Sequence, residues 1–327
     1  MSYDGRLLRL AQERYEADRS IREAEQAARR EAIYTSPRLR EIDEELRRTA
    51  SRVLAAALRR GQDPLPEIQR LKEQNLSLQE ERKGLLAELG LTETALEETP
   101  LCPLCGDTGY RGGEICRCLK VYYVEEQRKE LSKLLDLGGQ SFDTFDTDWY
   151  SDQRAPGKSK SAREHMEWVY DTCVEYAHNF GKRPANLLLF GRPGLGKTHL
   201  SAAIAREVSG KGFSVVYDTA GHVFERFEAQ KFGRDEAERD VERVLNCDLL
   251  ILDDLGTEMT TSFVQSALYQ LINGRLLAGK STVISTNLDP EELGRRYGAP
   301  LLSRLEGEYQ LLPFVGTDIR RLKRERG

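Results

Sequence analysis

Long apolar runs are missing from this sequence of 327 residues. No stretch approaches the roughly 20 apolar residues that span a bilayer, and the charged N-terminus contains no signal-peptide core. We therefore expect a cytoplasmic protein with no membrane partner. A large excess of one charge is also missing. The net charge of −5 neither favours nor excludes nucleic acid, because such binding depends on a local basic face.

Histidine is scarce, with four in the chain, and none lies near the clustered cysteines. Catalytic zinc usually keeps an open position beside His or carboxylate ligands, so a closed structural zinc site is favoured. Its candidate ligands are Cys102, Cys105, Cys116 and Cys118. The tight C-x-C spacing leaves open whether all four bind one ion, and a redox pair or free thiols remain alternatives. Cys173 and Cys247 stand alone in apolar surroundings and are expected in the core.

Residues 4–96 are expected to be helical, with breaks at 35–37 and 60–64. Heptad-like spacing predicts two helices that fold into an antiparallel hairpin. The predicted seam positions are Leu39, Ile42, Leu46, Thr49, Val53 and Ala56, then Ile68, Leu71, Asn75, Leu78, Arg82, Leu85 and Leu89. Asn75 and Arg82 would cost stability there while fixing register or partner. The pair either packs only on itself or forms a docking arm for another protein.

A charged helix is expected at 119–137, followed by a polar linker. The linker aromatics Phe142, Phe145 and Trp149 would either anchor it to the next domain or form walls of an adenine pocket.

Residues 186–190 are an apolar run, typical of a parallel strand buried on both faces. The run leads directly into GRPGLGKT, a complete G-x-x-x-x-G-K-[ST] motif, and a helix is expected at 198–211, so the motif has the setting of a P-loop. Lys197 would reach the β- and γ-phosphates of ATP, and the Thr198 hydroxyl would bind Mg²⁺. The candidate nucleotide contacts are Gly191, Arg192, Pro193, Gly194, Leu195, Gly196, Lys197, Thr198 and His199.

Four aliphatic residues precede Asp253 and Asp254, a pattern that predicts a strand delivering carboxylates to the edge of a parallel sheet. Asp253 would hold the Mg²⁺ shell, largely through water, and Asp254 would orient or deprotonate the attacking water. A later strand ends at Asn287, whose amide can position that water. Arg304, in a short predicted helix, would neutralise phosphate charge from a neighbouring subunit, although a solvated arginine is the plain alternative.

Around these motifs strands and helices alternate. The predicted elements are helices at 161–180, 221–231, 235–246 and 262–278, and strands at 213–218, 249–254 and 281–286.

The segments GRPGLGKT, LLILDDLGTE, VISTN and LLSRL, in this order, resemble the AAA+ ATPases of the bacterial replicative-helicase loader group, of the DnaC and DnaI type, and the related IstB-type transposition helpers. The similarity covers 142–326. The cysteine-rich segment resembles the zinc-containing N-terminal region of Gram-positive loaders. The resemblance implies an α/β fold: an AAA+ P-loop NTPase core with a parallel sheet, preceded by a helical, coiled-coil-like arm and a small four-cysteine zinc knuckle.

The resemblance also implies roles for single residues. Walker A falls at 191–198, Walker B at Asp253 and Asp254, sensor 1 at Asn287 and an arginine finger at Arg304, while Arg320 falls where a sensor 2 arginine is expected. The expected parts are a helical arm at 1–98, the knuckle and its helix at 99–138, a linker at 139–160 and the ATPase domain at 161–327.

Two functions follow as expectations. The first is a loader that binds the replicative DNA helicase through its N-terminal region and places it on single-stranded DNA. ATP binding and hydrolysis would then act as the switch, and the ATPase domains would self-associate. The second is an IstB-like, ATP-dependent DNA-remodelling helper of a transposase. The knuckle and arm favour the first, because such helpers typically have a short helical N-terminus. A nucleotide-binding adaptor without activity would not need both acids and Asn287.

Contact with single-stranded DNA would need basic residues beside aromatic ones. The candidates are Arg320, Arg321, Lys323, Arg324 and Arg326 at the C-terminus, and Lys231, Phe232 and Arg234. A solvated charge run is the plain alternative.

Overall fold

The computed structural model describes residues 3–58, 64–91, 100–133, 135, 139–154, 156–157, 159–231 and 235–326. The chain divides into two compact units, one of residues 13–116 and one of residues 1–12 with 117–327. Phe232, Arg234 and the interhelical turn at 60–63 lie outside the described residues, and the four expected parts stay a prediction. Within the described ranges no helix combines the length and apolar character of a membrane span.

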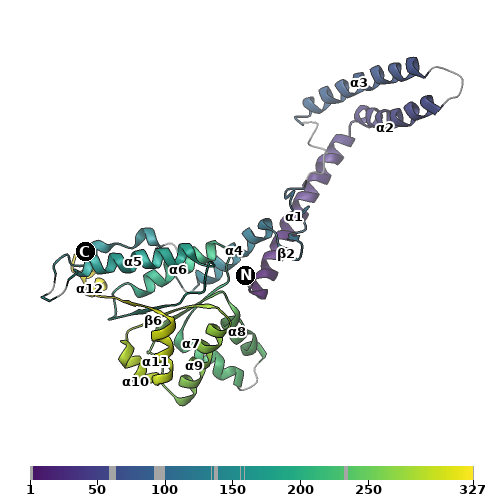
Figure 1. Cartoon of the computed structure of the whole chain (residues 1–327). Helices are drawn as coiled ribbons and strands as arrows, with labels where there is room; N and C mark the ends of the chain where they lie inside the picture. Colours follow the sequence, from purple (N-terminus) through teal and green to yellow (C-terminus); the bar gives the residue numbers. More distant parts are fainter. Residues whose placement is uncertain are drawn as a thin grey trace. The chain divides into compact units, whose positions relative to one another are not determined.

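Three helices build most of the unit at 13–116: α1 (Gly5–Tyr34), α2 (Pro37–Leu58) and α3 (Leu65–Glu88). The first turns of α1 belong to the other unit. Helices α2 and α3 lie side by side (Figure 1), and the packing of Leu39 with Leu86 together with the Arg82–Asp43 ion pair shows that they run antiparallel. In this unit α2 and α3 therefore form an antiparallel pair.

The seam of this hairpin follows the prediction over most of its length. Leu39, Ile42, Ala56 and Leu78 are buried, whereas Leu89 is half exposed and Leu86 is buried in its place. The seam therefore shifts by one helical position at the end of α3.

The two polar seam residues behave differently. Arg82 Nε donates to Asp43 Oδ1 across the hairpin at 2.8 Å, so this pair can fix register. Asn75 Oδ1 accepts a hydrogen bond from Gln79, one turn further along its own helix, at 2.6 Å. Asn75 therefore does not specify the pairing of α2 with α3 in this structure.

The second unit contains a parallel sheet. Its strands are β3 (Leu187–Phe190), β4 (Val215–Thr219), β5 (Leu249–Leu255), β6 (Ser281–Thr286) and β7 (Gln310–Pro313). The spatial order is β4-β5-β6-β3-β7, and every pairing is parallel. Strand β6 lies between β3, which leads to the P-loop, and β5, which carries the paired acids. This inserted central strand is the arrangement expected for an AAA+ core, so the predicted fold class is confirmed.

Helices cover both faces of this sheet. They are α4 (Arg117–Leu131), α5 (Ala162–Asn179), α6 (Lys197–Gly210), α7 (Ala220–Lys231), α8 (Asp235–Asn246), α9 (Ser262–Leu277), α10 (Pro290–Tyr297) and α11 (Ala299–Glu308). Alternate strand residues point to opposite faces. Leu187 and Leu189 pack with α4, α5 and α6, while Leu188 packs with α7 to α11 (Figure 1).

The elements predicted between 161 and 286 are confirmed, with boundaries that differ by at most two residues. Strand β7, helix α10 and the C-terminal helix α12 (Ile319–Arg326) were not predicted. The helix predicted at 119–137 is wrong at its end, because α4 stops at Leu131. The Ser132 hydroxyl donates to the Arg128 carbonyl, and the Lys133 amide bonds to Glu130, three residues back. Both contacts tighten the last turn and end the helix.

Helix α4 covers the open edge of the sheet. Strand β4 is an edge strand, with one row of backbone groups unpaired by other strands. Gln127 satisfies two of these groups, since its Nε2 donates to the Phe213 carbonyl at 2.6 Å and its Oε1 accepts from the Val215 amide at 3.2 Å. The side-chain amide therefore takes the place of a neighbouring strand.

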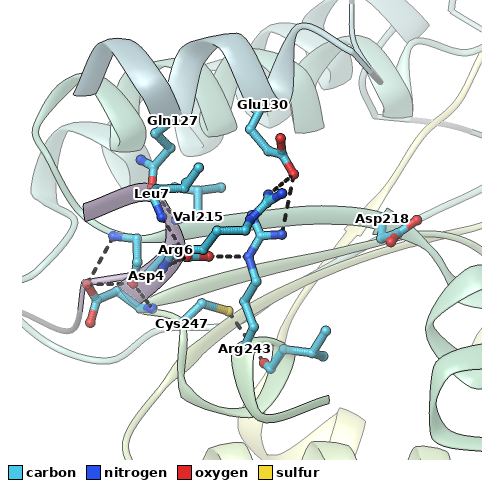
Figure 2. A network of polar contacts seen from close by, with 12 residues as sticks. Asp4, Arg6, Leu7, Gln127, Glu130, Val215, Asp218, Arg243 and Cys247 are labelled. Atoms are coloured by element: carbon cyan, nitrogen blue, oxygen red, sulfur yellow. Dashed lines mark hydrogen bonds and ion pairs between the residues drawn. The ribbon is translucent and has the colours of Figure 1, made fainter. Parts of the chain in front are cut away.

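The start of α1 is fastened to α4 and α8 by charged side chains (Figure 2). Asp4 caps α1 by accepting from the amides of Arg6 and Leu7 at 2.9 and 3.1 Å, and it also pairs with Arg243 of α8. Glu130 of α4 pairs with Arg6 and, at 3.5 Å, with Arg243. We call Asp4, Arg6, Glu130 and Arg243 the N-terminal clasp.

Candidate functional site

The P-loop connects β3 to α6, as its flanking sequence predicted. Gly194 and Gly196 have φ of +78° and +90°, a region that favours glycine. Space is limited as well, because a Cβ on Gly194 would lie 1.9 Å from the Asp318 carboxylate and one on Gly196 would lie 2.9 Å from the Phe145 ring. The loop is therefore closed in by the linker on one side and by the C-terminal segment on the other.

A cavity of about 360 Å³ opens above this loop. It is lined by Gln140, Thr144, Phe145, Asp146, Trp149, Pro193, Gly194, Leu195, Gly196, Lys197, Thr198, His199, Asp254, Thr257, Asn287, Ile319, Arg320 and Lys323. Most of the predicted site residues therefore surround one space. Gly191, Arg192, Asp253 and Arg304 do not line it.

Lys197 lies at the centre of the loop as the first residue of α6. Its ammonium donates to the Gly191 and Arg192 carbonyls at 2.6 and 2.9 Å, and to Asn287 Oδ1 at 2.8 Å. Burial lowers the pKa of this lysine to about 8, although the charges of Asp254 and Asp253 act against that shift. Asn287 and Lys197 thus share one hydrogen bond where the terminal phosphate of a nucleotide would be expected.

The paired acids differ in burial and in their contacts. Asp253 is 4% exposed and receives hydrogen bonds from the Tyr217 and Ser285 hydroxyls. Asp254 has a φ of +54°, rare outside glycine, and lies where the β5–β6 register shifts between Leu252 and Leu255. The bulge turns Asp254 onto the cavity wall, where strict alternation would have turned it toward the opposite face.

The side-chain oxygen atoms of Thr198, Asp253 and Asp254 suit a magnesium ion. Mg²⁺ keeps several waters and takes one or two carboxylates beside phosphate oxygens. Thr198 and Asp254 both line the cavity, and Asp253 is buried directly before Asp254 in β5. When bound, Mg²⁺ would supply charge neutralisation for the phosphates.

Asp254 also has the electrostatics of a proton acceptor. Burial first, and then the Asp253 charge, raise the pKa of Asp254 above its ordinary value, while Lys197 and Arg320 act in the opposite direction. A raised carboxyl pKa brings a base closer to neutrality, where general-base catalysis is most effective.

The linker aromatics anchor the linker to the core, and two of them also line the cavity. Phe142 and Phe145 pack against the core on the α6 side, and Phe145 and Trp149 also line the cavity. The Tyr150 hydroxyl donates to the Leu195 carbonyl of the P-loop at 2.9 Å. His199 Nε2 lies 2.8 Å from the Ser141 carbonyl oxygen. The linker therefore braces the P-loop through Tyr150 and Ser141, a role that no sequence pattern indicates.

The C-terminal segment closes another side of the cavity. The Ile319 amide donates to the Gly194 carbonyl at 3.0 Å, which holds α12 over the P-loop. Arg320 and Lys323 line the cavity, and the Lys323 ammonium lies 5.5 Å from the centre of the Trp149 ring. Two of the basic residues considered for DNA contact therefore face the nucleotide cavity instead.

Arg304 lies away from this cavity. It is exposed in the middle of α11, and it has no hydrogen-bond or ion-pair partner within the described chain. This position argues against Arg304 acting as an arginine finger on the nucleotide of its own protomer.

The four clustered cysteines form a separate candidate metal centre. The sulfur atoms of Cys102, Cys105, Cys116 and Cys118 all lie within 4.8 Å of one another, and Cys102 and Cys116 are buried. The Cys102 and Cys116 sulfurs are 3.6 Å apart, whereas a tetrahedral Zn²⁺ with bonds of about 2.3 Å would separate them by about 3.8 Å. The set of four thiols therefore fits zinc.

The local fold explains how the tight C-x-C spacing can be used. Cys116 follows the short hairpin of β1 (Tyr110–Arg111) and β2 (Glu114–Ile115), and Cys118 lies in the first turn of α4. The change from strand to helix between them turns both sulfurs toward the same point. Asp107 accepts from the Leu101 and Cys102 amides and fixes the first cysteine loop.

Comparison with known proteins finds similarity in the central part of the chain. Residues 176–312 match the family described as IstB-like ATP binding protein. The replicative helicase loader DnaC of Buchnera aphidicola subsp. Baizongia pistaciae (strain Bp) is 30% identical over 133 residues, which is 40% of this chain and 54% of that protein. DnaC of Escherichia coli (strain K12) is 27% identical with the same coverage.

This chain thus spans about half the length of the curated relatives that it matches. Among solved structures, that of the DnaC helicase loader aligns with a TM-score of 0.45 at 24% identity, covering 55% of this chain and 98% of that one. That of DnaI aligns with a TM-score of 0.44 at 19% identity, covering 57% and 93%.

Proposed function

We propose that this protein is an ATP-dependent loader of the replicative DNA helicase. The main support is the cavity, in which the P-loop, Asp254, Asn287 and Arg320 surround one space within a domain of the IstB-like ATP-binding family. Relatives that carry the name replicative helicase loader extend the proposal from nucleotide binding to helicase loading. The N-terminal region would bind the helicase, and single-stranded DNA would be the site of delivery.

Each site residue has a defined task in the proposed hydrolysis. Lys197 would exchange its carbonyl and Asn287 contacts for phosphate oxygens, which frees the Asn287 amide to hold the attacking water. Asp254 would accept the proton of that water. Thr198 and Asp253 would hold the magnesium shell, and Arg320 would contact the phosphates from α12.

Arg304 would act on the nucleotide of a neighbouring protomer. Its exposure and its lack of a partner in the described chain support a role in self-association. Hydrolysis would then depend on assembly, and nucleotide state could decide whether the helicase is held or released.

The alternative function is an IstB-like, ATP-dependent helper of a transposase, which the family match supports equally well for residues 176–312. The cysteine cluster and the α2–α3 hairpin favour the loader, because they form an N-terminal region well beyond a short helix.

The deciding experiment is a binding assay with the full-length chain. Purified replicative helicase from the same organism should co-elute with it in ATP, and Asp254→Asn should keep ATP binding while losing hydrolysis. Co-elution with a transposase and not with the helicase would decide for the alternative.

A further inference from the structure

The carboxylate of Asp253 is held on both of its oxygens by side chains of the two flanking strands. The Tyr217 hydroxyl, from β4, donates to Oδ2, and the Ser285 hydroxyl, from β6, donates to Oδ1. All three side chains are buried. Tyr217 belongs to none of the motifs by which the sequence predicted the nucleotide site, and Ser285, which lies within VISTN, was given no role there.

Strand register explains why these residues meet. Thr219 of β4 pairs with Asp253, and Tyr217 pairs with Ile251, so Tyr217 and Asp253 point to the same face of the sheet. Ser285 follows Ile284, which pairs with Leu252, and it reaches that face from the other side. This is the face covered by α6, the helix that begins with Lys197.

Ser285 connects the two acids as well. Its hydroxyl oxygen lies 3.2 Å from the Asp254 amide, from which it accepts a hydrogen bond. One hydroxyl therefore fixes both the orientation of the Asp253 carboxylate and the backbone of the bulge that turns Asp254 toward the cavity. Tyr217 has a simpler arrangement, because Asp253 is the single hydrogen-bond partner of its hydroxyl among the described residues.

We propose that Tyr217 is a positioning residue that holds Asp253 for the magnesium shell, with Ser285 as its counterpart on β6. The inference rests on the proposed function, since it assumes that Mg²⁺ and ATP bind in this cavity. A carboxylate fixed by two donors needs no reorientation when it accepts hydrogen bonds from metal-bound water. Partners that orient a metal-binding group are worth about 10- to 100-fold in metal affinity or activity.

A tyrosine that only fills the core would give a different result. Removing its hydroxyl would change the affinity for ATP equally with and without Mg²⁺, whereas removing a positioning hydroxyl changes how tightly the metal binds. Tyr309 provides the matched control. It is as buried as Tyr217, at 6% exposure, but packs against the opposite face of the sheet.

The test measures binding of a fluorescent ATP analogue to the full-length protein at increasing Mg²⁺ concentrations. For Tyr217→Phe we expect the Mg²⁺ concentration that gives half of the metal-dependent gain in affinity to rise about 10-fold or more. Affinity without Mg²⁺ should match that of the wild type. Ser285→Ala should shift the same Mg²⁺ midpoint, and Tyr309→Phe should not.

Two results would overturn the inference while leaving the proposed function intact. One is an unchanged Mg²⁺ midpoint in Tyr217→Phe when the wild-type protein binds the ATP analogue more tightly with Mg²⁺ than without it. The other is an equal loss of affinity with and without Mg²⁺, which would indicate a structural role. A wild-type protein that binds no ATP analogue at any Mg²⁺ concentration would overturn both the inference and the proposed function.

Discussion

Replacing Arg243 by methionine should loosen the first turns of α1 without unfolding the ATP-binding unit. Arg243 belongs to α8 and pairs with Asp4 and Glu130 in the N-terminal clasp (Figure 2). Methionine keeps an unbranched apolar stem and removes the charge. The Asp4 carboxylate would then stay largely buried with its helix-capping contacts but without its cation.

The size of the effect follows from partial burial. Removing one partner of a fully buried ion pair costs about 3–5 kcal/mol, and an exposed pair is worth about 0–1 kcal/mol. The Arg243 and Asp4 side chains are 20% and 8% exposed, so we expect about 2 kcal/mol, which corresponds to roughly a 30-fold change in the opening equilibrium. Leu7, Ala11 and the contact between the Tyr3 and Tyr123 rings still hold the segment in place, so opening stays local.

Amide hydrogen exchange measures this opening directly. Amides of residues 7–12 should exchange roughly 30-fold faster in Arg243→Met than in the wild type, while amides of β5 and β6 stay protected. Arg239→Met is the matched control, because Arg239 lies on the same helix, is exposed and has no partner in the described chain. Equal exchange in both variants would refute the reasoning. An effect of Arg243→Met that persists in an Asp4→Asn background would also refute it, since the pair would already be broken.

Three further predictions concern pH, metal and assembly. Burial acts to raise the pKa of Glu130, but the contacts with Lys133, Arg6 and Arg243 outweigh it and hold that pKa below 4.5. The N-terminal clasp should therefore be fully stabilised above pH 4.5, and its amides should lose protection from exchange as the pH falls below that value. Glu130→Gln should abolish this pH-dependent loss once exchange is corrected for the intrinsic rates. Purified protein should contain about one zinc per chain by elemental analysis, lost in Cys118→Ser and retained in Cys173→Ser. Arg304→Ala should keep ATP affinity but lose the rise in specific ATPase activity with protein concentration, while Arg295→Ala keeps it; an unchanged rise in Arg304→Ala would contradict a finger acting between subunits.

The parallel strands and the P-loop could be predicted because the residues that favour each strand locally are also the residues that the buried sheet needs. The apolar runs of β3 and β5 are buried on both faces, so most of their residues are aliphatic and the pattern is easy to detect. The P-loop after β3 and the ends of β5 and β6 meet at the same edge of the sheet, and they contribute Lys197, Asp254 and Asn287 to one cavity. Parallel pairing alone is enough to bring them together.

Other parts of the site depend on contacts that leave no local pattern. Phe145 and Tyr150 reach the P-loop from a polar linker, and their partners are a glycine surface and a backbone carbonyl. Lys323 looked like one member of a basic tail, although its ammonium lies over the Trp149 ring at the cavity. The charged composition of the C-terminus predicted that the Lys323 side chain would be exposed. Its contact with Trp149 depends on the path of the chain after β7.

The two acids of the central strand show most clearly where sequence reasoning stops. Alternation along β5 places Asp253 on the α6 face and would place Asp254 on the other. A left-handed residue at Asp254 breaks this alternation and brings both acids to the same side. Such a backbone conformation costs free energy and persists only where surrounding contacts hold it, and here the Ser285 hydroxyl supports the bulge through the Asp254 amide. A buried serine in a neighbouring strand therefore helps to divide two adjacent aspartates into one that is held behind the cavity and one that faces it.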